Sequence, residues 1–298
     1  EINLPIYKDD EYNINAKVGD RVVVYKTFDN YGSDEMQLQY YISDVDKRIE
    51  LYIIGIGFIV LVLLIARKNG LKALFALIVT IAFIIKIFIP AIYNGYSPIF
   101  FAIITTIFSS LVTIYFTVGM NKKFVVALLG VTSGVLIAGI LSYLFTYRMR
   151  LNGFLDSDLL ASAYLLKNIK IKELIPAGVI IGSLGAVMDV AVSITSSINE
   201  LHETDPNMSK KSMFKSAINI GNDIIGTMIN TLILAYIASS IFTLLLIYIQ
   251  ANEYPLIRIL NFQDIAVEIM RSICGSIGIL IAVPLTAYIG TVIYKKNK

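Results

Sequence analysis

Seven hydrophobic runs organise the chain after residue 50. They are Leu51–Ala66, Leu71–Ile89, Ser97–Val118, Phe124–Thr146, Leu174–Asn199, Ile224–Ile249 and Ser272–Tyr294. Only Lys72, Lys86 and Asp189 carry charge inside these runs. A helix needs about 20 mostly apolar residues to cross a hydrocarbon core of about 30 Å. The pattern therefore predicts an all-α polytopic membrane protein with about seven transmembrane helices, in a domain covering 50–298. Pro284, inside the last run, predicts a kink there.

The first 49 residues follow a different pattern. Apolar and polar residues alternate over Met36–Ser43, as in a half-buried strand. Ala16–Phe28 is interpreted as a second pair of strands, with a turn at Val18-Gly19-Asp20. We predict a small extracytoplasmic β-rich segment over 1–49. Because so short a segment holds little core of its own, we expect it to be the end of a larger β-domain.

Two of the longer connections predict amphipathic helices at the membrane surface. Asp156–Leu166 begins with capping residues and continues with leucines. Asp264–Met270 places Asp264, Glu268 and the following Arg271 on one helical face.

Composition supports the membrane class. Hydrophobic residues make up 56% of the chain and charged residues 16%, against about 25% in soluble proteins, and the mean hydropathy is +0.73. This excludes a disordered chain, a disulfide scaffold and an ordinary soluble enzyme. With one cysteine (Cys274) and one histidine (His202), we expect no disulfide, no metal site and no cofactor. A net charge of +3 does not indicate nucleic acid.

Charge in the short loops sets the orientation. Lys122 and Lys123 lie in a tight turn, whereas the turn at Ala91–Tyr96 has no charge. Since basic residues accumulate on the cytoplasmic side, we expect the N-terminus outside and the C-terminus in the cytoplasm. Lys86, four residues before Pro90, is expected to extend to the outer surface rather than to pair with Asp189.

Polar residues recur along one face of the fifth and of the sixth predicted span. On the fifth, the face comprises Gly182, Gly185, Asp189, Ser193, Ser196 and Glu200. On the sixth, it comprises Asn219, Asp223, Gly226 and Asn230, with Asn222 and Thr227 beside it. Steps of three and four residues put each set on one side of a helix.

The depths of the two polar faces match. Asp189 lies about 15 Å and Asn230 about 14 Å from the same membrane surface, at a rise of 1.5 Å per residue. Antiparallel spans therefore place Asp189 near Asn230. The same register places Ser193 and Ser196 near Gly226 and Asp223, and Glu200 near Asn219 and Lys215.

Two interpretations of these faces remain open. An ionised Asp at this depth costs several kcal/mol unless it is paired, hydrated or protonated, so the residues are candidates for an ion or substrate pathway. The candidate pathway residues are Asp189, Ser193, Ser196, Asn222, Asp223 and Asn230. Alternatively, the same residues form a hydrogen-bond network that joins two helices. Gly221-Asn222-Asp223 is either a break in the sixth helix or a simple bend.

The motifs of several membrane enzymes are absent. His202-Glu203 is followed by Thr204, Asp205 and Pro206, so the chain lacks the His-Glu-x-x-His of zinc proteases. Asp189 follows Ala-Val-Met rather than Gly-x-Gly, no histidine lies in a span to serve a serine protease, and no P-loop occurs. We predict that the chain is not an enzyme.

One stretch resembles a known family. It contains Gly182-Ser-Leu-Gly-Ala-Val-Met-Asp-Val-Ala, then Ser-Ile-Asn-Glu-Leu-His-Glu, then Asn219-Ile-Gly-Asn-Asp-Ile-Ile-Gly-Thr-Met-Ile-Asn. These residues resemble the YibE/F-like family of bacterial multipass membrane proteins. The resemblance implies a permease-like protein of the bacterial plasma membrane whose subunits associate.

Two hypotheses of function follow. The first is a transporter or channel for a small ion or solute, with the pathway between the fifth and sixth spans. The second is a membrane scaffold or signalling component whose outer segment binds a partner. In both, the partners are the lipid bilayer and a second copy or related subunit, with no nucleic acid.

Overall fold

Helices dominate the structure, a computed structural model that describes residues 2–3, 14, 16–17, 19–29, 37–153, 168–250 and 255–295. Within these residues, six helical stretches are long and apolar enough to cross a membrane. They are Arg48–Tyr93, Pro98–Val118, Lys122–Arg148, Ile171–Thr204, Lys210–Ser239 and Gln263–Tyr294. The chain divides into two compact units, Glu1–Leu71 and Lys72–Lys298.

The first unit contains a sheet of three strands in the order β1-β3-β2. Strand β2 (Val22–Asp29) is antiparallel to β3 (Gln37–Val45), and β1 (Ile2–Asn3) is parallel to β3. The strand predicted over Met36–Ser43 is therefore confirmed as β3. The strand pair predicted within Ala16–Phe28 is wrong, because the described residues of this stretch form only one strand, β2, in its second half. Gly19 turns the chain with a φ of 103°, and β2 then pairs with β3 along its whole length.

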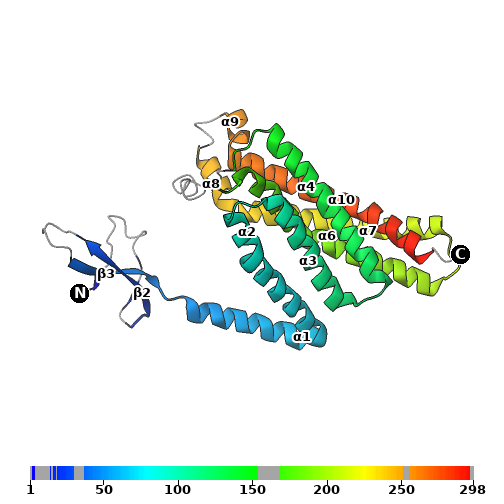
Figure 1. The fold of residues 1–298 in the computed structure, drawn as a ribbon, viewed down its shortest axis with the longest axis horizontal. Helices are drawn as coiled ribbons and strands as arrows, with labels where there is room; N and C mark the ends of the chain where they lie inside the picture. Colours follow the sequence, from blue (N-terminus) through cyan, green and yellow to red (C-terminus); the bar gives the residue numbers. More distant parts are fainter. Residues whose placement is uncertain are drawn as a thin grey trace. The chain divides into compact units, whose positions relative to one another are not determined.

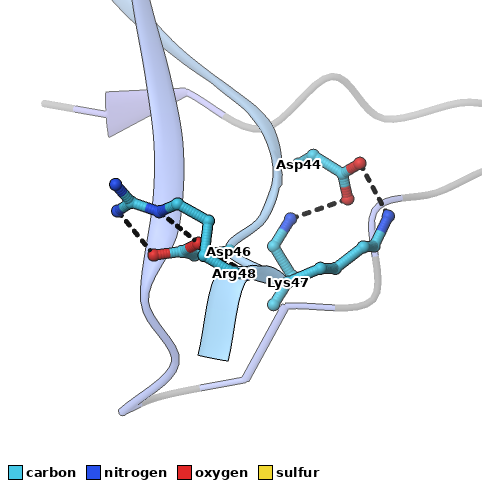
Figure 2. Close-up of polar contacts among 5 residues, drawn as sticks. Asp44, Asp46, Lys47 and Arg48 are labelled. Carbon is cyan, nitrogen blue, oxygen red and sulfur yellow. Dashed lines mark hydrogen bonds and ion pairs between the residues drawn. The ribbon is translucent and has the colours of Figure 1, made fainter. Parts of the chain in front are cut away.

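Charged pairs tie the end of β3 to the helix that follows (Figure 2). Asp46 accepts hydrogen bonds from Nε and Nη2 of Arg48, at 2.8 and 2.7 Å. Asp44 accepts one from Nζ of Lys47 and one from its neighbour's backbone N–H, each at 2.7 Å. The Arg48 hydrogen bonds lower the pKa of Asp46 to about 2, and the Lys47 hydrogen bond is the main cause of a lowered pKa at Asp44.

The stretch Arg48–Tyr93 comprises α1 (Arg48–Phe83), a π-helical turn η2 (Ile84–Phe88) and α2 (Ile89–Tyr93). As one straight helix its 46 residues would be about 69 Å long, more than twice the hydrocarbon core. Arg67, however, leaves the helical region, with φ 49° and ψ −127°. A Cβ on Gly70 would lie 2.7 Å from the Val62 carbonyl oxygen, although eight residues of straight helix cover about 12 Å. The chain therefore turns back at Arg67, between the first two predicted spans.

The second unit is a helical bundle (Figure 1). Its long helices are α3 (Pro98–Val118), α4 (Lys122–Arg148), α6 (Ile171–Thr204), α7 (Lys210–Ser239) and α10 (Gln263–Tyr294). The sequence caps three of them: Ser97, Asn121 and Ser209 each accept a hydrogen bond from the backbone N–H three residues later. Such caps satisfy donors that the first turn of a helix leaves free.

Small residues let α4, α6 and α10 approach closely. A Cβ on Gly134 of α4 would lie 2.9 Å from the carbonyl oxygen of Gly278 of α10, and one on Gly278 would lie 3.0 Å from that of Gly134. A Cβ on Gly139 would lie 2.7 Å from Ile180 of α6. Close backbone approach is how membrane helices gain packing energy without a hydrophobic effect between them. The core of the bundle is therefore formed by these three helices.

Two predictions about the second unit are corrected, and a third falls on residues that the structure does not describe. Asp264–Met270 is not a separate surface helix, because α10 is continuous from Gln263 to Tyr294 and passes through Pro284. The sixth predicted span is displaced: α7 runs unbroken through Gly221 and ends at Ser239, and α8 (Ile241–Gln250) follows it. Gly221 packs against α10 instead of breaking the helix. The helix predicted over Asp156–Leu166 lies outside the described residues.

Candidate intramembrane site

The polar face predicted on the fifth span exists on α6, and it points away from the core. Its six members are all exposed: Gly182, Gly185, Asp189, Ser193, Ser196 and Glu200. The opposite face of the same helix is buried, with Val187, Ile194 and Ile198 fully covered. Because the core takes the apolar face, the polar face is left on the surface of the chain at membrane depth.

Helix α7 repeats this arrangement. Its buried positions are Met213, Ala217, Gly221 and Leu232. The predicted polar face lies on its exposed side, with the residues Asn219, Asn222, Asp223, Gly226, Thr227 and Asn230. Two neighbouring helices therefore both turn polar residues outward from the bundle.

Two contacts establish the antiparallel register of α6 and α7. A Cβ on Gly182 would lie 2.9 Å from the hydroxyl of Tyr236, and one on Gly221 would lie 3.4 Å from Cδ1 of Ile194. Counting along the helices from either contact puts Asp189 level with residues 226–229 of α7. Asp189 and Asn230 therefore lie within about one helical turn of each other in depth, as expected from the sequence.

The two faces share a depth, but their side chains do not bond to one another. Within the part of the chain that the structure describes, neither Asp189, Asp223 nor Asn230 has a side-chain hydrogen bond or ion pair. A Cβ on Gly185 or on Gly226 would meet no atom within 4 Å. The hydrogen-bond network that would join α6 to α7 is therefore not formed between the described residues. Lys86 is exposed in η2, and no ion pair joins it to Asp189 in this part of the chain.

An exposed polar face has a physical consequence in a membrane. A carboxylate at the centre of a spanning helix costs about 2.5–3.5 kcal/mol on insertion scales. The amide, hydroxyl and glycine positions around it add polar surface that lipid chains do not solvate. The faces of α6 and α7 therefore need either water or another protein surface against them.

A hydrogen-bond chain fixes the C-terminal end of α6 against α10. The hydroxyl of Tyr294 donates to Asn199 at 3.0 Å, and the amide of Asn199 donates to Glu203 at 2.6 Å. The Lys295 ammonium donates to the carbonyl of Pro206 at 2.7 Å. These hydrogen bonds join the ends of α6 and α10 beside Glu200, the last residue of the α6 face.

The sequence placed Glu268 and Arg271 on one helical face, but it did not identify the cluster that they form with Tyr236 at the opposite end of the bundle. Nη1 of Arg271 pairs with Oε1 of Glu268 at 2.9 Å, and the guanidinium carbon lies 6.0 Å from the Tyr236 ring centroid. Gly178 and Gly182 of α6 leave room for these large groups. Two signals in the sequence were available. An acid and a base lie three residues apart at Glu268 and Arg271, and two glycines lie four residues apart at Gly178 and Gly182 on another helix.

The described residues contain no group of three or more His, Cys, Asp or Glu side chains placed to hold a metal ion. Cys274 is a buried free cysteine. The candidate site is therefore a surface of carboxylates, amides and hydroxyls.

Fold and site together define a multipass helical membrane protein with polar faces at membrane depth. The family model of the YibE/F-like protein matches residues 54–296. The chain belongs to this family, as the resemblance in its fifth and sixth spans indicated. No curated protein and no solved structure matches the chain.

Proposed function

We propose that this protein is a permease for a small ion or solute, with its pathway along the outward polar faces of α6 and α7. The observation that carries the proposal is the exposure of all six residues of the α6 face around an unpaired Asp189. Asp189 is the ionisable centre, and Ser193, Ser196 and Asn230 supply hydroxyl and amide oxygens. Intramembrane carboxylates on such faces commonly serve ion and proton pathways.

The pathway requires a second subunit. One chain leaves the polar faces open to lipid, so a second copy or a related subunit is needed to enclose water against them.

We propose that the protein lies in the bacterial plasma membrane. We propose seven crossings, because the reversal at Arg67 divides Arg48–Tyr93 into two. The N-terminal sheet then lies outside and the C-terminus in the cytoplasm, as the loop charges indicate.

A membrane scaffold is the second candidate. Gly185 and Gly226 lie on the outward faces with open space around them. Small residues at such positions allow close packing of helices from another subunit. In this role the polar faces hold subunits together and nothing passes between them.

Substitution of Asp189 by Asn tests the proposal. In proteoliposomes assayed for H⁺, Na⁺, K⁺ and Mg²⁺ uptake, we expect flux of one of these ions in the wild type. We expect D189N to reduce that flux by about two orders of magnitude or more, because the amide neither carries charge nor accepts a proton. D205N, at the end of α6 and off the polar face, is the matched control and should transport normally.

Each result decides between the two candidates. Normal flux in D189N contradicts the pathway assignment. Absence of flux in the wild type, with loss of subunit assembly in D189N, supports the scaffold. Retention of the wild-type oligomer and unfolding profile in D189N shows that lost flux does not come from lost folding.

A further inference from the structure

A cavity of about 640 Å³ lies at the end of the bundle away from Glu200. The last turn of α7, the helices α8 and α9 (Leu256–Leu260) and the first turns of α10 surround it. These elements gather at one end of the bundle in Figure 1. Its volume falls in the range of small-molecule sites, about 300–1,000 Å³. The cavity is too small for a whole diacyl phospholipid.

The walls of the cavity combine hydrocarbon side chains with hydroxyl and carboxyl groups. Nine of its sixteen lining residues are Ile or Leu. Five carry hydroxyl groups: Tyr236, Ser239, Ser240, Thr243 and Ser272. The remaining two are the carboxylates Asp264 and Glu268, and no lysine or arginine is among the described residues that line the cavity.

Glu268 is anchored through one oxygen only. Its Oε1 pairs with Arg271, whereas its Oε2 is buried and has no hydrogen-bond partner among the described residues. The hydroxyl of Tyr236 is buried and unpaired in the same way. Both atoms have almost no accessible surface, so a ligand in the cavity reaches them through a small rotation of these two side chains and then supplies the hydrogen bond that Oε2 lacks.

Arg271 orients Glu268 without occupying the cavity. A Cβ on Gly178 would lie 4.0 Å from its Nη2, so the guanidinium extends toward α6. It also packs over the Tyr236 ring. Its Nη1 holds Oε1 of Glu268 beside the cavity, and its own Nε is buried without a hydrogen-bond partner among the described residues.

We propose that this cavity binds a small organic cation with an apolar body, an alkyl- or arylammonium. The ammonium group donates hydrogen bonds to Glu268 and to the Tyr236 hydroxyl, and the hydrocarbon packs against the isoleucines. An anion is repelled by the unpaired Oε2 of Glu268, and a neutral alcohol gains no charge-assisted bond. The inference does not rest on the proposed permease function, since Asp189 lies elsewhere on α6.

Three matched probes test the charge preference. Full-length protein in phosphatidylcholine nanodiscs is titrated with octylammonium, octanol and octanoate, and binding is followed by calorimetry and by the unfolding temperature. We expect octylammonium to bind at least about ten-fold more tightly than octanol, and octanoate more weakly than both. Equal affinities for octylammonium and octanol would overturn the proposal, because the cavity would then bind apolar chains alone.

Four variants test whether octylammonium binds in this cavity. E268Q should remove the preference for octylammonium, and E203Q, at the other end of α6, should keep it. I273F fills the cavity without touching a charge and should weaken all three probes, so it remains informative if E268Q fails to fold. Unchanged octylammonium binding in I273F contradicts the site. D189N should bind octylammonium normally, which separates this inference from the permease assignment.

Discussion

At the scale of single residues, the clearest electrostatic feature is Asp46 beside Arg48. The guanidinium donates two hydrogen bonds to a carboxylate whose side chain is 6% exposed. These bonds stabilise the charged form, which is why the pKa of Asp46 falls to about 2. The pair joins β3 to α1, so it fixes how the strand leads into the helix (Figure 2).

Acid titration tests this pair. Because the folded pKa of Asp46 is lowered, its stabilisation is present above the unfolded value of about 3.8 and is lost as pH falls from about 4 to about 2. In R48Q we expect the carboxyl resonance of Asp46 to titrate close to its ordinary pKa. A ¹³C NMR titration checks this, and K47Q, which affects Asp44 instead, should leave the Asp46 midpoint near 2. An unchanged midpoint in R48Q would show that Arg48 is not the cause.

At the scale of elements, glycines on α7 have two different roles. Gly221 is buried, and a Cβ there would overlap Cγ1 of Val283 on α10. Val283 is 1% exposed and β-branched, so it has little freedom to move. Gly226, one and a half turns further along, has open space around it. The first glycine is thus a packing residue, and the second belongs to the outward polar face.

The matched substitutions G221A and G226A test this difference. We expect G221A to destabilise the protein by about 1–3 kcal/mol through overpacking. We expect G226A to change the stability of the monomer little or to raise it by up to about 1 kcal/mol, since alanine favours the helix. Denaturation in detergent measures both, and equal losses in the two variants would contradict the packing of α7 on α10.

The sequence predicted the elements of this protein unevenly, and the reason is physical. Hydrophobic length is a local property of the sequence, so the apolar runs were found directly. Whether a helix stops depends on tertiary contacts. Gly221 was therefore interpreted as a possible break, and Asp264–Met270 as a separate helix, although α7 and α10 are continuous there.

The candidate site was also predicted in part. Spacing gave the residues of each polar face and their depth, because both follow from helix geometry. Spacing does not say which way a face points. The structure turns the faces of α6 and α7 outward, and it brings Tyr236 of α7 to the Glu268–Arg271 pair of α10, although Tyr236 is more than 30 residues away in sequence.

At the scale of the whole molecule, the proposed pathway depends on water reaching a surface that one chain leaves open. The buried side of the bundle offers no alternative path for the predicted residues, since all of them lie on the exposed side of α6 and α7. In the proposed permease, transport therefore depends on the association of subunits. The single native cysteine, Cys274, is buried, so introduced cysteines report on their own surroundings.

Cysteine accessibility measures whether water reaches the polar faces of α6 and α7. Single cysteines at Gly185, Ser193 and Asn230 are compared in native membranes with cysteines at Ile140 and Leu144, which are exposed apolar positions of α4. A membrane-impermeant methanethiosulfonate reacts with thiolates, which form only in water. If water reaches the polar faces, we expect rapid labelling at the three polar positions and none at Ile140 and Leu144. Labelling of S193C as slow as that of I140C would contradict it.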